Sequence, residues 1–199
     1  MQIKVATIDE LRRIYATDLV AAFPPEELKP LSAMERLMDE GRYLPLLLTE
    51  NEHILGQMFV WLGPENYGLI DYLAVNETYR NGGLGAKLLE LAFAAYPQLT
   101  FLGEAEAPTG DPARDAMILR RLGFYTRAGA KWTGYEVALF GVRFRTFYWA
   151  PQPIADEALL PYHQTIYRRQ FTESAYARYI QIPLRNGDVL PPCAPWVED

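Results

Sequence analysis

The stretch IDYLAVNETYRNGGLGAKLLELA, residues 70–92, decides how this sequence is interpreted. Its first six residues are typical of a strand, and from Leu84 onward the apolar residues recur at the spacing of one helix face. The loop between them holds three glycines, Gly82, Gly83 and Gly85. Successive main-chain N–H groups of such a turn converge near the positive end of the helix dipole, so the loop is predicted to bind an anion such as a pyrophosphate.

Two well-known phosphate-binding patterns do not fit this loop. A dinucleotide-binding G-x-G-x-x-G would need a glycine where Leu88 follows Gly83 and Gly85. A P-loop would need a Gly-Lys-Ser/Thr run, and the loop contains none. The loop therefore belongs to neither class.

The composition narrows the function classes. With 199 residues, half of them apolar, the chain can bury a sizeable core as one domain or as one domain with an extension. The formal net charge of −6 argues against nucleic-acid binding, which needs a dense cationic surface. The single cysteine, Cys193, and the two distant histidines, His53 and His163, predict neither a disulfide framework nor a metal cluster.

The N-terminal sequence predicts neither export nor membrane binding. It carries a charge within its first four residues and has no apolar segment of the kind that begins a signal peptide. No window approaches the run of apolar residues that a membrane helix needs. We therefore expect a cytoplasmic protein without a membrane partner.

The expected elements follow an order that differs from a doubly wound fold. A strand and two helices come first, three antiparallel strands follow within residues 43–75, and a helix from Leu84 ends before Pro97. Asp111 is expected to cap a second helix, with Pro112 in its first turn. The remaining expected elements are a strand within 99–108, strands within 135–150, a helix within 154–171 and a last strand within 176–184.

The C-terminal region is expected to extend the main domain. Residues 1–150 are predicted to form that domain, and residues 151–199 to pack on it as a helix, a last strand and a Pro-rich tail. His163 lies in the amphipathic pattern of the helix, and His53 lies in a turn before a strand. Both are expected at the surface or in ordinary packing.

Three motifs around the glycine loop resemble those of the GCN5-related N-acetyltransferase (GNAT) superfamily. YRNGGLGAKLL matches the family's acyl-CoA signature, [RQ]-x-x-G-x-[GA], at Arg80, Gly83 and Gly85. DYLAV and LGEAEAP are similar to its fourth and fifth strands, and RRLGFYTRAGA to the tyrosine segment of its next helix. The resemblance implies a mixed α/β fold with a central twisted, mostly antiparallel sheet, splayed fourth and fifth strands, and flanking helices.

The same resemblance implies an N-acetyltransferase, an acyltransferase that uses acetyl-CoA as co-substrate and no metal. The acceptor would be a primary amine of a small molecule or a protein, and a homodimer is compatible with the family. The main chain of Leu73, Ala74 and Val75 would bind the pantetheine arm and polarise the thioester carbonyl. The pyrophosphate would be held by the loop residues Arg80, Asn81, Gly82, Gly83, Leu84, Gly85 and Ala86.

Acyl transfer to an amine needs a base, because an amine with a pKa of about 10.4 is protonated at neutral pH. Asp71, Glu104 and Glu106 lie near the positions where the resemblance places the splay. The two glutamates are two residues apart and so share one face of the expected strand. We prefer Glu104 because it is nearer the strand interior, with Glu106 next. An ordinary solvated strand face is an equally open interpretation.

In this family a tyrosine of the next helix usually gives a proton to the departing thiolate. One alignment ends this helix at Gly123 and places Leu119 at the tyrosine position, which would favour an inactive acyl-CoA-binding module. The other ends it near Gly129 and places Tyr125 there. We prefer the second, because it accounts for the Phe-Tyr pair and a glycine inside a helix costs only about 1 kcal/mol. Tyr125 as an ordinary core aromatic is the alternative.

Overall fold

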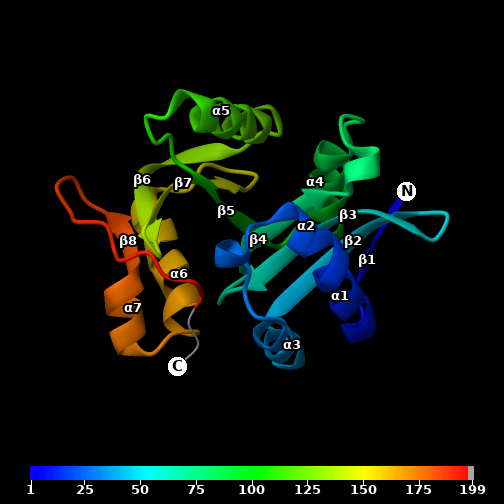
Figure 1. The fold of residues 1–199 in the computed structure, drawn as a ribbon, viewed down its shortest axis with the longest axis horizontal. Coiled ribbons are helices and arrows are strands. Elements are labelled where there is room, and N and C mark those ends of the chain that lie inside the picture. The colour runs from blue at the N-terminus through cyan, green and yellow to red at the C-terminus, as the bar shows by residue number, and fades with distance from the viewer. Residues whose placement is uncertain (197–199) are drawn as a thin grey trace. The chain divides into compact units, whose positions relative to one another are not determined.

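The computed structural model describes residues 1–196, apart from the side chain of Glu26, and the chain divides into two compact units. Unit 1 comprises Met1–Leu62 and Ile70–Leu99, and unit 2 comprises Gly63–Leu69 and Thr100–Asp199. Figure 1 labels the elements of both. The last three residues of the expected Pro-rich tail lie outside the described residues. Within residues 1–196, no helix has both the length and the apolar character required to cross a membrane.

The strands of unit 1 form the meander that the sequence predicts. β1 pairs antiparallel with β2, β2 pairs antiparallel with β3, and β4 is next in strand order. Asn51 and Glu52 connect β2 to β3 with φ of 47° and 67°. Two positive φ angles in a two-residue loop match the right-handed twist of a hairpin. The strands are β1 (Gln2–Val5), β2 (Tyr43–Glu50), β3 (His53–Leu62) and β4 (Tyr67–Val75), the last of which begins in unit 2.

The helices of unit 1 begin and end at residues with clear roles. Thr7 and Glu10 form a capping box at the start of α1. Gly41, with φ of 66°, follows the C-terminus of α3, and this left-handed conformation favours glycine. The helical segments are α1 (Ile8–Ile14), the π-helical η1 (Tyr15–Leu19), α2 (Val20–Ala22), η2 (Pro25–Glu27), α3 (Leu31–Asp39), η3 (Glu77–Tyr79) and α4 (Leu84–Ala95).

The two faces of β3 are covered by different segments. A Cβ at Gly56 would lie 3.6 Å from Leu88 of α4, so α4 covers this face closely. Three residues further along, Phe59 points to the other face, because side chains alternate along a strand. There its ring packs on Tyr72, which in turn packs on Phe23 before η2. Unit 1 therefore buries apolar residues on both faces of its strands.

Within Thr100–Trp196 of unit 2, the strands are paired in the order β5-β7-β6-β8, and all three neighbouring pairs are antiparallel. The strands are β5 (Thr100–Glu106), β6 (Lys131–Leu139), β7 (Val142–Trp149) and β8 (Ile180–Leu184). The helices are α5 (Pro112–Arg127), α6 (Asp156–Arg168) and α7 (Glu173–Tyr179). Asp111 caps α5 by accepting from the N–H of Ala113, at 2.9 Å, as expected.

α7 is a helix that the sequence pattern did not predict. A last strand was expected within 176–184, whereas the chain is helical to Tyr179 and the strand begins only at Ile180. The hydroxyl of Thr172 accepts from the N–H of Ala175, at 3.3 Å, and caps this short helix.

Side chains alternate between the two faces of β5, so the neighbours Gly103 and Glu104 point to opposite faces of the strands in unit 2. Gly103 lies opposite Phe147 on β7, and Glu104 lies opposite Thr146. The ring of Phe147 packs against Tyr125 of α5, with 4.5 Å between ring centroids. Glu104 contacts α6 instead, through His163. α5 therefore covers the Gly103 face and α6 the Glu104 face.

The chain thus has the mixed α/β fold expected from the sequence. Its strands are mostly antiparallel, and helices pack against them in both units. The expected strands and helices between residues 43 and 150 are all confirmed, with ends that differ by a few residues.

Replacing Gly103 by alanine should lower the free energy of unfolding by about 1–3 kcal/mol. A Cβ at this position would overlap the Cε2 atom of Phe147, whose ring is buried and held between other aromatic rings. Urea unfolding followed by circular dichroism measures the change. Gly82→Ala is the control, because its Cβ would lie 3.7 Å from the nearest atom, and its cost should stay within about 0.5 kcal/mol. Equal costs for the two variants would contradict close packing at Gly103.

Candidate functional site

The glycine loop of unit 1 has the backbone shape that its sequence suggests. After η3 the chain passes through Arg80 in an extended conformation and Asn81 with φ of 68°. Gly83, with φ of 75° and ψ of 3°, stands at the N-cap of α4. This left-handed conformation favours glycine, so the sequence Asn-Gly-Gly turns the chain directly into the helix.

The main-chain N–H groups of this loop fit an anion. Among residues 1–196, those of Asn81, Gly82 and Gly83 donate to no acceptor, and all three residues are exposed. The first N–H groups of α4 have no partner inside the helix either, and the helix dipole adds partial positive charge. A Cβ at Gly83 would meet no atom within 4 Å, so the space beside it is open.

The basic side chains of the loop make contacts of their own. Nε of Arg80 donates to the main-chain oxygen of Val75, at 3.3 Å, and its guanidinium lies 4.0 Å from Glu77. Lys87 pairs with Glu90 at 2.8 Å. The carbonyl of Val75 is therefore engaged, although the resemblance implies that the main chain of residues 73–75 binds the pantetheine arm. Both cations are about half exposed and sit on flexible stems, so they can turn toward a bound anion.

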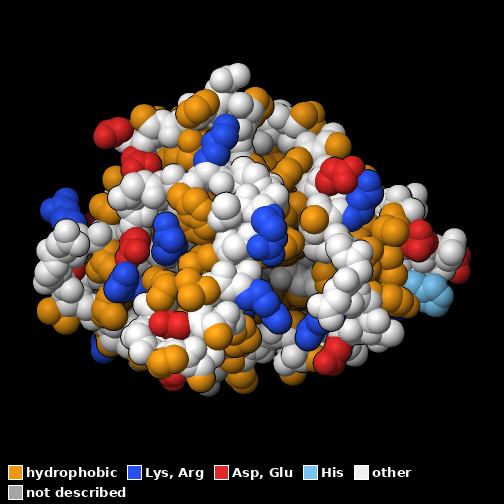
Figure 2. Space-filling view, turned by 90° about the horizontal axis from the view of Figure 1, so that it is seen from above, with side chains coloured by type: hydrophobic (Ala, Val, Ile, Leu, Met, Phe, Trp, Pro, Cys, Tyr) orange, Lys and Arg blue, Asp and Glu red, His pale blue; other side chains and the backbone are white. Residues whose placement is uncertain are grey.

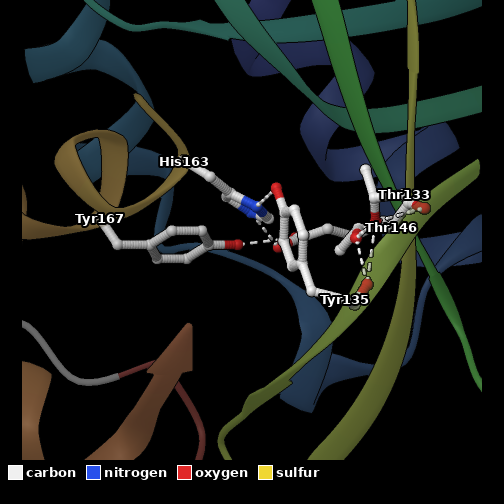
Figure 3. Close-up of polar contacts among 6 residues, drawn as sticks. Thr133, Tyr135, Thr146, His163 and Tyr167 are labelled. Carbon is white, nitrogen blue, oxygen red and sulfur yellow. Dashed lines mark hydrogen bonds and ion pairs between the residues drawn. The ribbon is translucent and has the colours of Figure 1, made fainter. Parts of the chain in front are cut away.

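In unit 2 the carboxylate of Glu104 is held by two side chains of α6. Nε2 of His163 lies 2.7 Å from Oε1, and the hydroxyl of Tyr167 donates to Oε2, also at 2.7 Å. Figure 3 shows His163 and Tyr167 pointing from α6 toward the strands. The side chain of Glu104 is 10% exposed, whereas that of His163 is fully buried. The carboxylate is thus fixed by two hydrogen bonds and retains a small opening to solvent.

The other ring nitrogen of His163 is also bonded. Nδ1 lies 3.1 Å from the hydroxyl of Tyr135, which belongs to β6. Burial raises the pKa of Tyr135, and the negative charges of Glu104 and Asp156 raise it further. The phenol therefore keeps its proton at neutral pH. Figure 3 shows Tyr135 beside Thr133 and Thr146, whose hydroxyls both donate to its main-chain oxygen.

The other two candidate carboxylates are engaged with cations. Glu106 is on the same strand as Glu104 and forms an ion pair with Arg114 near the start of α5. Asp71 in unit 1 is paired with the buried Lys29 and accepts from the hydroxyl of Tyr43 at 2.6 Å. Of the three, Glu104 alone is held entirely by groups that are neutral when the histidine is neutral.

Tyr125 lies near the C-terminus of α5, and the helix ends as the preferred alignment requires. Gly129 has φ of 83°, its N–H donates to Thr126, and the N–H of Ala130 donates to Tyr125, each at 3.0 Å. This is a Schellman motif, which commonly ends a helix at glycine. Gly123 lies inside the helix, so the expected end at Gly129 is confirmed.

The hydroxyl of Tyr125 is available for a further hydrogen bond. It donates to no acceptor among residues 1–196, while the ring packs on Phe147 and Trp149. Burial raises the pKa of Tyr125, and the positive charge of Arg121 opposes the increase. The phenol is therefore protonated at neutral pH but is a weaker acid than a solvated tyrosine. Its ring lies on the Gly103 face of the strands, opposite the face of Glu104.

The competing position, Leu119, faces solvent. It is 57% exposed, as is Met117 at 56%, so neither is a core residue. The structure therefore gives Leu119 no packing role like that of a buried tyrosine.

Figure 2 shows hydrophobic side chains interspersed with Lys and Arg side chains over the face that it displays, without one continuous basic patch.

Sequence reasoning missed the part that α6 plays beside Glu104. His163 was expected at the surface or in ordinary packing, yet it is buried with both ring nitrogens bonded. One sequence signal existed, because His163 and Tyr167 are four residues apart and so lie on one face of a helix. That spacing does not reveal which strand the face contacts.

Comparison with known proteins identifies the family to which this geometry belongs. The model of the acetyltransferase (GNAT) family matches residues 8–124, more than half of the chain. No curated protein sequence matches. Several solved structures share the fold.

Three of these structures illustrate the likeness. A Bacteroides thetaiotaomicron protein assigned to the GNAT family has a TM-score of 0.67 and 19% identity, over 82% of this chain and 95% of its own. An aminoglycoside 6'-N-acetyltransferase complexed with coenzyme A has a TM-score of 0.56 and 16% identity, over 78% and 100%. The ribosomal-protein-S18-alanine N-acetyltransferase of Escherichia coli has a TM-score of 0.53 and 16% identity, over 78% and 96%.

Two neighbouring substitutions in α5 test the orientation of this helix. Ile118→Ala should cost about 2–5 kcal/mol of unfolding free energy, because Ile118 is 2% exposed and its removal leaves a cavity. Leu119→Ala should change it by no more than about 0.5 kcal/mol, because that side chain faces solvent. Denaturant unfolding measures both. A larger cost at Leu119 than at Ile118 would mean that the helix is rotated and would restore the alignment without a tyrosine.

Proposed function

Because the chain belongs to the acetyltransferase (GNAT) family, we propose that it transfers an acetyl group from acetyl-CoA to a primary amine of a small molecule or a protein, by direct attack in a ternary complex. The observation that carries this proposal is the glycine loop. The loop leads into α4, and the main-chain N–H groups of Asn81, Gly82 and Gly83 are exposed and unpaired within the described residues. The loop lies inside the segment that the family model matches. A structural neighbour complexed with coenzyme A supports the same ligand.

The proposed binding residues follow the loop and the end of β4. The main chain of residues 80–86 holds the pyrophosphate, because unpaired N–H groups and the helix dipole both favour negative charge. Arg80 releases the carbonyl of Val75 when its guanidinium turns to the phosphates. The main chain of Leu73, Ala74 and Val75 then bonds the pantetheine arm. When bound, acetyl-CoA supplies the acetyl group as a thioester.

Glu104 is the proposed general base. It takes a proton from the ammonium form of the acceptor, so that the neutral nitrogen can attack the thioester carbon. Overall, one N–C bond forms, the C–S bond breaks, and one proton passes to solvent through Glu104. We prefer Glu104 to Glu106, because Glu106 is engaged in an ion pair with Arg114, whereas Glu104 is held by two hydrogen bonds from α6.

Tyr125 is the proposed general acid. It gives its phenolic proton to the departing sulfur and regains one from the attacking nitrogen. Its raised pKa works against this donation, while the apolar surroundings that raise it also penalise a free thiolate. One observation favours the alternative of an inactive acyl-CoA-binding module, since Tyr125 and Glu104 lie on opposite faces of the strands. Turnover decides between the two.

Gly83→Val should abolish CoA binding in a protein that still folds. The substitution adds a branched side chain to the open space beside the loop and strains a backbone with φ of 75°. Isothermal titration calorimetry with CoA measures the loss. Gly41→Val is the matched control, because Gly41 has φ of 66° and equally open space but lies after α3. It should show a similar loss of stability and unchanged affinity. Normal affinity in folded Gly83→Val would contradict the anion site.

Tyr125→Phe should reduce kcat by about 10²–10⁴ if departure of the thiolate limits the rate. The ring and its packing remain, so the free energy of unfolding and the affinity for CoA should hardly change. Thiol release from acetyl-CoA, assayed over a panel of amines, measures the rate. Full activity of the variant, with thiol release shown to be the slow step, would make Tyr125 a packing residue. Binding of CoA without turnover of any amine by the unaltered protein would support the inactive module.

A further inference from the structure

We propose that His163 and Tyr167 of α6 are positioning residues that orient the carboxylate of Glu104 to accept the proton of the amine. This role rests on the proposed function, in which Glu104 is the base. Both residues lie outside the segment that the family model matches, residues 8–124. The C-terminal region would then complete the catalytic machinery of the domain.

The carboxylate is bound in a way that leaves it capacity to react. Each oxygen accepts one hydrogen bond at 2.7 Å, from His163 on one side and Tyr167 on the other. An ionised carboxylate can accept about four hydrogen bonds, so about two lone pairs remain. The side chain is 10% exposed, so it is not sealed completely from solvent. Hydrogen bonds donated to a carboxylate favour its charged form.

The neighbours of His163 fix its tautomer. An ionised carboxylate can only accept hydrogen bonds. Nε2 of His163 must therefore be protonated, and its N–H donates to Glu104. In a neutral imidazole Nδ1 is then an acceptor, and the hydroxyl of Tyr135 donates to it. Because Tyr135 stays protonated at neutral pH, this donor is always present. The chain of donors therefore runs in one direction, from Tyr135 through His163 to Glu104.

A bulge in β6 places Tyr135 where its hydroxyl can donate a hydrogen bond to Nδ1 of His163. The register of β6 against β7 shifts between Trp132 and Glu136. The hydroxyls of Thr133 and Thr146 bond the Tyr135 carbonyl there, and the N–H of Gly134 donates to Asp156 at 2.8 Å. Bulges commonly redirect a side chain beside an active site. Asp156 is the first residue of α6, so the bulge also anchors the helix that carries the two donors.

The groups around the carboxylate and around the hydroxyl of Tyr135 come from three elements. α6 contributes the titratable side chains His163 and Tyr167, with Asp156 at its N-terminus, and β6 contributes Tyr135. β7 contributes the hydroxyl-bearing Thr146 directly opposite Glu104. With His163 neutral, the two donors to Glu104 carry no charge, so both contacts are hydrogen bonds without an ion pair.

Two substitutions of His163 separate the functions of its ring nitrogens. The amide nitrogen of Gln reaches nearly as far as Nε2, so His163→Gln retains a donor to Glu104. The shorter Asn reaches only the place of Nδ1, so His163→Asn retains a partner for Tyr135 and loses the donor. We expect His163→Asn to lower kcat by about 10–10²-fold, the scale of a misplaced catalytic group, and His163→Gln to retain most activity.

The pH profile distinguishes positioning from general support of the fold. With one donor lost, the acid limb of the kcat/KM profile should move to higher pH in His163→Asn, because the charged carboxylate is less favoured. Tyr167→Phe removes the other donor and should move the limb in the same direction. It also serves as the second variant if His163→Asn does not fold. Unchanged profiles in both tyrosine and histidine variants, or equal kcat for Asn and Gln, would overturn the proposal.

A measurement without substrate separates this proposal from that of the base itself. In protein labelled with ¹³C at the glutamate carboxyls, the Glu104 signal is the one missing from Glu104→Gln. Its titration midpoint should rise in His163→Asn and stay near the original in His163→Gln. An unchanged midpoint would overturn the positioning role. Full activity of Glu104→Gln would instead show that Glu104 is not the base. The proposed function of Glu104 and the positioning role of His163 and Tyr167 in catalysis would then both be overturned, whatever the titration shows.

Discussion

The register between β5 and β7 is the constraint on which unit 2 depends. Gly103 and Glu104 are neighbours in sequence, yet one must face an aromatic layer and the other a buried histidine. A slip of one residue would exchange the faces of every side chain on the strand. It would place a carboxylate beneath Phe147 and leave His163 without its acceptor. Because burial of an unpaired charge is so costly, the register is strongly specified.

The two helices that cover the faces of this sheet, α5 and α6, make different kinds of contact with it. α5 covers the aromatic side and supplies ring packing, with Trp149 donating to the Ala128 carbonyl at 2.9 Å where the helix ends. α6 covers the polar side and supplies hydrogen-bond donors. A buried polar group needs its partners close and well oriented. α6 is therefore held at its first residue by the bulge and in its middle by Glu104.

The sequence could predict those features of this arrangement that a single local pattern determines, such as the ends of a helix. Asp111 before Pro112 indicated the start of α5, and Gly129 indicated its end, because each position demands a particular backbone conformation. α7 was missed, since a seven-residue helix has few periodic positions and ends in residues that also suit a strand. The contact of His163 with Glu104 could not be predicted, because 59 residues separate them and helix periodicity does not indicate which strand a face meets.

The bulge at Gly134 also affects how unit 2 moves. The N–H of Gly134 donates to Asp156 at the start of α6. At the next residue of β6, Tyr135, a second chain of hydrogen bonds leads through His163 to Glu104 of β5. α6 cannot detach from the sheet without leaving Asp156, Tyr135 and Glu104 unpaired together. Local opening of this helix is therefore coupled to opening of the bulge, and the amide hydrogens of both should exchange with solvent as one cooperative unit.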